Sequence, residues 1–170
     1  MATAAHRKAA IDVGLLYGDT WGVSHHREAV KYLWKDLKFE IIICPTVIKE
    51  LDVAEIVGTE KISGLTNRVR QELDDSIFLI EGHLSTGIDD KIRDQAKIIV
   101  EKGLIPNGSK NDARLLIEAS HFGCSDVITV RASLLEADNS ALCEALREFG
   151  YEPVAISSPK ALVGPNAVRL

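Results

Sequence analysis

The stretch Phe39-Glu40-Ile41-Ile42-Ile43-Cys44 decides the fold of this chain. It is nearly all apolar and rich in β-branched residues, a pattern typical of a parallel strand that is buried on both faces of its sheet. Pro45 is expected to end this strand, Thr46 to cap the next helix, and the helix to run from Val47 onward. The pattern therefore predicts a buried strand that leads directly into a helix.

Strands and helices alternate along the rest of the chain. Further strands are expected in the apolar run 9–16, at 77–80, at 126–130 and at 153–156, where Pro153 indicates an edge strand. Helices are expected at 27–35, 60–74, 89–102 and 109–122 and around the apolar residues of 142–149. This alternation predicts a three-layer α/β/α domain with a central, mostly parallel sheet of about five strands and right-handed helical crossovers.

Length and composition limit the class of protein. The chain has 170 residues, 46% of them hydrophobic and 26% charged, so we expect a single domain over residues 1–170 with a sizeable core. The net charge of −5 argues against a strongly basic nucleic-acid clamp, but not against a nuclease that holds its substrate through metal ions. The three cysteines form no CxxC pair, and no stretch reaches ~18 apolar residues. We therefore expect a cytoplasmic protein without a membrane span.

Two carboxylates are expected near the carboxyl edge of the sheet, where the sites of such folds gather. Asp12 interrupts the otherwise apolar first strand near its end, so it either caps the following turn or is buried and must be paired or bind a cation. Glu50 lies about 60° from Val47 on the helical wheel, at the flank of the apolar stripe. It either leans toward the sheet edge or stays exposed, which is the more common state of a helical Glu.

Asp112 lies within the apolar face of the expected helix 109–122, in the first turn, where the helix dipole favours an anion. Ser109-Lys110-Asn111-Asp112 also matches a capping box, in which this carboxylate turns back to the Ser109 backbone. If Asp112 instead points across the sheet edge toward Asp12 and Glu50, the three carboxylates repel one another and require a cation. Oxygen ligands favour Mg²⁺ or Mn²⁺, and these ions suit phosphodiester hydrolysis.

The order and spacing of these residues resemble the PIN-domain family of metal-dependent ribonucleases over roughly residues 9–163. The similar segments are Ala10-Ile11-Asp12, Cys44-Pro45-Thr46-Val47-Ile48-Lys49-Glu50-Leu51, Asn111-Asp112-Ala113-Arg114-Leu115-Leu116-Ile117-Glu118-Ala119, Gly123-Cys124-Ser125-Asp126-Val127-Ile128-Thr129 and the closing Pro153-Val154-Ala155-Ile156-Ser157-Ser158-Pro159. The resemblance implies an endoribonuclease that cuts RNA with Mg²⁺ or Mn²⁺, with Asp12, Glu50 and Asp112 as metal ligands that position the attacking water. Many members are toxins held by an antitoxin protein and many are dimers, so an antitoxin and a homodimer are also expectations of the resemblance.

Two positions depart from the family pattern. Val13-Gly14 stands where the family has a small polar pair after its first Asp, and Arg131 stands at the position of the fourth acid. Ser133 is a candidate to supply an oxygen instead, and Thr129 a candidate to orient ligands. Arg131 either holds a substrate phosphate, as a bidentate guanidinium does well, or is exposed to water. We therefore expect one cation site and a poor or absent second one.

These departures favour a second hypothesis, a degenerate, non-catalytic PIN-like module that binds RNA or a protein partner. A cation between Asp12 and Asp112 would count against it, and an empty site bridged by Arg131 would support it. Trp21 and Trp34 are candidates for stacking on RNA bases, although a core or interface position is the more common role of a tryptophan. The sequence thus leaves two functions open, a nuclease and a binding module.

Overall fold

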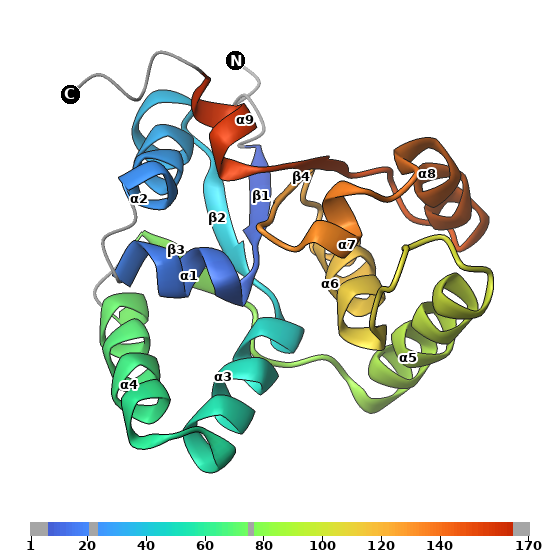
Figure 1. The fold of residues 1–170 in the computed structure, drawn as a ribbon. Coiled ribbons are helices and arrows are strands. Elements are labelled where there is room, and N and C mark those ends of the chain that lie inside the picture. Colours follow the sequence, from blue (N-terminus) through green and yellow to red (C-terminus); the bar gives the residue numbers. More distant parts are fainter. Residues whose placement is uncertain (1–6, 21–23, 75–76, 165–170) are drawn as a thin grey trace.

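The sheet of this protein contains five parallel strands in the order β3-β2-β1-β4-β5 (Figure 1). The computed structural model describes residues 7–20, 24–74 and 77–164. The strands are β1 (Lys8–Ile11), β2 (Glu40–Ile43), β3 (Phe78–Ile80), β4 (Asp126–Ile128) and β5 (Ala155–Ser157). Every neighbouring pair is parallel, so the predicted parallel sheet of about five strands is confirmed.

Helices cover both faces of this sheet. They are α1 (Val13–Thr20), α2 (Ser24–Lys31), the π-helical η1 (Tyr32–Asp36), α3 (Pro45–Val57), α4 (Glu60–Asp74), α5 (Thr86–Glu101), α6 (Lys110–His121), α7 (Ala132–Leu135), α8 (Asn139–Glu148) and α9 (Pro159–Val163). In Figure 1, α1, α2 and α4 lie on one side of the sheet and α5, α6 and α8 on the other. Helix α1 packs against α2 and α4, and α5 packs against α6. The predicted three-layer α/β/α architecture is confirmed.

Strand β2 lies inside the sheet, between β1 and β3. Its consecutive residues Ile41, Ile42 and Ile43 are all fully buried. Side chains alternate between the two faces of a strand, so a run of buried residues requires that both faces are covered. The helices on the two sides of the sheet provide this cover, as the apolar sequence of the strand predicted.

The apolar run 9–16 contains the end of a strand and the start of a helix. Strand β1 ends at Ile11, and helix α1 starts at Val13. The Asp12 carboxylate accepts a hydrogen bond from the backbone N–H of Leu15 at 2.7 Å, which is the contact of a helix N-cap. This contact turns the chain from strand to helix within one residue. It leaves Asp12 at the carboxyl end of β1.

The expected cap at Thr46 is wrong, whereas β2 does end before Pro45 as expected. Pro45 is the first residue of α3, where its missing N–H costs nothing, and Cys44 is the N-cap residue. Thr46 donates its backbone N–H and its hydroxyl to the Glu118 carboxylate instead of capping α3. The last strand, β5, lies at a sheet edge as predicted, although it begins only at Ala155.

The helices described in residues 7–20, 24–74 and 77–164 are each too short or too polar to cross a membrane.

Candidate functional site

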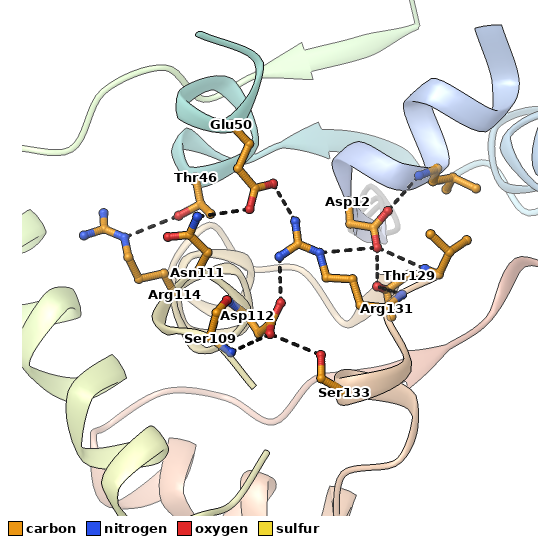
Figure 2. A network of polar contacts seen from close by, with 12 residues as sticks. Asp12, Thr46, Glu50, Ser109, Asn111, Asp112, Arg114, Thr129, Arg131 and Ser133 are labelled. Carbon is orange, nitrogen blue, oxygen red and sulfur yellow. Dashed lines mark hydrogen bonds and ion pairs between the residues drawn. The ribbon is translucent and has the colours of Figure 1, made fainter. Parts of the chain in front are cut away.

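The three candidate carboxylates meet at the carboxyl edge of the sheet (Figure 2). Asp12 directly follows β1, Glu50 comes from the second turn of α3, and Asp112 comes from the first turn of α6. These segments are distant in sequence but adjacent in space because β1 and β2 are neighbours and α3 packs against α6. The sequence had left alternatives open at each of these positions, and the structure brings all three to the edge at which they were candidates.

Arg131 lies between the three carboxylates (Figure 2). Its Nη1 atom is 2.7 Å from the Asp112 Oδ1 atom, and its Nη2 atom is 2.5 Å from the Glu50 Oε2 atom. Its Nε atom is 3.8 Å from the Asp12 Oδ2 atom. The side chain is only 18% exposed, so the guanidinium faces the carboxylates rather than water. One guanidinium thus uses all three of its nitrogens on three acids.

Asp12 is fully buried, and both of its carboxylate oxygens accept hydrogen bonds. Oδ1 accepts from the Leu15 N–H, and Oδ2 accepts from the Thr129 hydroxyl and from the Val130 N–H. The Thr129 hydroxyl in turn accepts a bond from the Arg131 N–H at 3.0 Å. Thr129 therefore orients both Asp12 and the backbone of Arg131.

Asp112 combines the two roles between which the sequence left a choice. Its Oδ2 atom accepts from the Ser109 N–H at 2.7 Å and completes a capping box, while its Oδ1 atom accepts from Arg131. A carboxylate has two oxygens, so capping does not exclude a contact across the sheet edge. Ser133, a candidate oxygen donor to a metal, donates its hydroxyl to Asp112 Oδ2 at 3.1 Å.

Glu50 leans toward the sheet edge. One of its oxygens accepts from Arg131, and the other accepts from the Asn111 side-chain amide at 3.1 Å. Every oxygen of the three carboxylates therefore accepts a hydrogen bond. The guanidinium also occupies the space between them, so this arrangement does not fit a divalent cation. Within the described parts of the chain, no three His, Cys, Asp or Glu side chains are placed to hold a metal ion.

Burial and pairing act in opposite directions on the charges of the site. Burial alone would raise the pKa of Asp112, but hydrogen bonds from Arg131 and Ser109 outweigh it and hold this pKa below its usual value. Burial alone would lower the pKa of Arg131, but its contacts with Asp112 and Glu50 raise it above the usual value. Both groups are therefore charged at neutral pH, and each stabilises the charge of the other.

Gly14, the other departure from the family pattern, has a steric reason. A Cβ atom at this position would lie 2.5 Å from the Val130 Cγ2 atom and 3.4 Å from the Asp12 Oδ1 atom. Val130 precedes Arg131 and fills the space that a side chain after Asp12 would need. The two departures from the family pattern are therefore physically adjacent.

We expect Gly14→Ala to lower the free energy of unfolding by about 1–3 kcal/mol, because Val130 must shift to admit the methyl group. Gly64 in α4 provides a matched control, because a Cβ atom at this position would meet no other atom within 4 Å. Gly64→Ala should therefore stabilise the helix by about 0.5–1 kcal/mol. Urea unfolding of both variants measures the difference. Equal effects of the two substitutions would contradict the steric reason for Gly14.

A second polar network, which the sequence analysis missed, supports the site from α6. The fully buried Glu118 accepts hydrogen bonds from the Thr46 N–H at 2.8 Å and from Arg114 at 3.0 Å. Arg114 also donates to Asp89 at 2.5 Å, which lowers the pKa of Asp89. Glu118 lies about 60° from Leu115 and about 40° from Phe122 on the helical wheel, inside the apolar face. A charged residue inside the apolar face of a helix indicates that its carboxylate is buried with a partner, and this is the sequence signal for the network.

A different surface surrounds Trp34, which is 42% exposed and therefore not a core residue. The Lys35 ammonium lies 5.8 Å from the centre of the Trp34 ring. Beside Trp34 is a hollow of about 250 Å³ that Lys38, Phe39 and Glu40 also line. Because Glu40 begins β2, this hollow lies at the sheet edge opposite the carboxylates. The other candidate for base stacking, Trp21, lies outside the described residues.

Comparisons with known protein families and curated proteins identify no relative of this chain. Neither a scan against protein-family models nor a search of curated proteins finds a match to this chain. The resemblance to PIN domains therefore remains a prediction that rests on the order and spacing of the residues quoted above.

Proposed function

We propose that this chain is a PIN-like module that binds single-stranded RNA. It does not use a divalent cation and does not cut the RNA. The observation that carries this proposal is the position of Arg131, whose guanidinium pairs with Asp12, Glu50 and Asp112. A nuclease of this kind needs carboxylate oxygens directed at metal ions that activate water and neutralise the phosphate. Here those oxygens are directed at Arg131 and at backbone and side-chain donors.

The surface around Trp34 supports RNA as the ligand. An exposed aromatic ring beside lysines is the usual way in which proteins hold single-stranded nucleic acid, since bases stack on the ring and phosphates attract the cations. Lys35 and Lys38 lie at this surface with Trp34. The carboxylate cluster has three acids and one guanidinium and would repel a phosphate, so the opposite sheet edge is the better place for RNA.

The experiment measures binding and cleavage of a fluorescently labelled single-stranded RNA together, in buffer with Mn²⁺ and in buffer with EDTA. We expect intact RNA in both buffers and binding that EDTA does not change. Trp34→Ala should weaken binding about 5- to 150-fold, the loss of one stacked base. Leu135→Ala is the control, because Leu135 on α7 has the same exposed fraction as Trp34, 42%, but lies on a different surface. This variant should bind RNA as the wild type does.

A metal-dependent endoribonuclease is the second candidate, and the convergence of Asp12, Glu50 and Asp112 at one edge favours it. This function requires that Arg131 leaves the cluster. Cleavage that needs Mn²⁺ and is lost on Asp112→Asn would establish it and reject the first proposal. Absence of both cleavage and binding would reject RNA as the ligand and leave a protein partner, including the antitoxin that the resemblance implies.

A further inference from the structure

The charges of the acidic cluster raise the question of what balances them. Asp12, Glu50 and Asp112 come from three segments that the fold forces together. Asp12 is fully buried, and Asp112 is 5% exposed. Carboxylates at this depth repel one another and lose hydration, so the folded state needs a positive charge among them. A divalent cation bound between carboxylate oxygens is one way to supply that charge.

The guanidinium of Arg131 supplies the positive charge that the three acids need, as part of the chain itself. Its three nitrogens point at three different carboxylates, and a planar guanidinium is the side chain best suited to several acceptors at once. Its own position is fixed by the Thr129 hydroxyl, which accepts from the Arg131 N–H while donating to Asp12. The guanidinium is therefore held in place by its backbone as well as by its charge.

We propose that Arg131 is a built-in substitute for the metal ion, so that this cluster is independent of divalent cations as long as Arg131 is present and becomes dependent on them when it is removed. This inference rests on the proposed function, because it assumes that the wild-type cluster binds no metal. It goes further in assigning to one side chain the structural role of a cofactor. The guanidinium and the divalent cation are then alternative occupants of one space.

Arg131→Ser tests this exchange, since it removes the cation and leaves the three acids and a small neutral side chain. Metal-stripped wild type and variant are titrated with MnCl₂ by calorimetry, and their melting temperatures are measured with Mn²⁺ and with EDTA. The wild type should show no saturable heat and the same melting temperature in both buffers. The variant should melt lower in EDTA and bind Mn²⁺ saturably, and its melting temperature should rise by about 5–10 °C when free Mn²⁺ is about 100 times Kd.

The double variant Arg131→Ser/Asp112→Asn is the control for the location of the ion. It lacks one of the acids and should lose the Mn²⁺ response. If Arg131→Ser does not fold without metal, refolding in Mn²⁺ should restore its circular dichroism spectrum, and a failure to do so would overturn the inference. An equal Mn²⁺ response of the double variant would also overturn it, because the ion would then bind elsewhere.

The outcomes separate this inference from the proposed function. Saturable Mn²⁺ binding by the wild type that Asp112→Asn abolishes would reject both. If neither the wild type nor Arg131→Ser shows a saturable heat of Mn²⁺ binding or a shift in melting temperature, only the inference is rejected. The wild-type site would still be independent of metal.

Discussion

Replacing Arg131 by methionine is expected to lower the free energy of unfolding at neutral pH by about 3–5 kcal/mol. Methionine keeps much of the length of the side chain but removes the charge that faces Asp12, Glu50 and Asp112. The loss is large because Asp12 and Asp112 stay behind buried, with the half-buried Glu50 beside them, without their cation. Urea unfolding measures it, with Arg93→Met as the control. Arg93 pairs with Asp90 on the surface of α5, so its replacement should cost less than about 0.5 kcal/mol.

The effect of this substitution should depend on pH in a defined direction. In the wild type the pKa of Asp112 is below its usual value, so the stability from this pairing is present above about pH 4 and is lost as the pH falls through the lowered pKa. In Arg131→Met, Asp112 remains buried but its cation is gone. Protonation of the carboxylate at low pH removes the unpaired buried charge and so reduces the destabilisation of the variant. The gap in unfolding free energy between the two proteins should narrow from neutral pH to about pH 4 and below. A gap that stays constant over this range would show that Arg131 acts through packing and not through charge.

Glu118→Ala is the second substitution with a large expected effect, a loss of about 3–5 kcal/mol. It leaves the Thr46 N–H without its 2.8 Å acceptor and removes one of the two carboxylates that pair with Arg114. Glu118→Gln keeps an acceptor oxygen and should recover part of this loss. Glu101→Ala is the control, since Glu101 and Lys97 form a pair that is mostly exposed on α5. Urea unfolding that gives Glu118→Ala and Glu101→Ala the same stability would contradict a structural role of the buried network.

The sequence predicted the architecture because hydrophobic periodicity reflects burial directly. The isoleucines of β2 are buried on both faces, and the polar residues that follow the strands lie at the expected edge. It also made Asp12, Glu50 and Asp112 candidates for that edge. Helix α1 was missed because its first residues continue the apolar run of β1, although a cap at Asp12 was one of the two alternatives and the N-cap bond from Leu15 to Asp12 is present.

The partner of the acids was harder to predict for a related reason. Sequence position places Arg131 at the edge of the sheet, but the direction of its side chain depends on the Thr129 hydroxyl and on the facing acids of α3 and α6. For Arg131 itself the sequence offered phosphate binding or exposure to water, and a bridge across the acids only as the mark of a non-catalytic module; the structure shows that bridge. Likewise, the capping box and the outward-facing oxygen of Asp112 were treated as alternatives, although one carboxylate serves both.

The contacts of Arg131 also bear on the lifetime of the folded state. Arg131 bonds to residues that are 19 and 81 positions away along the chain, so its ion pairs form only after distant segments have been brought together. The folding transition state already buries most of the apolar surface, and we expect ion pairs that depend on exact side-chain geometry to form after it. Interactions that are absent from the folding transition state slow unfolding and leave the folding rate nearly unchanged. We therefore expect replacement of Arg131 to speed unfolding more than it slows folding.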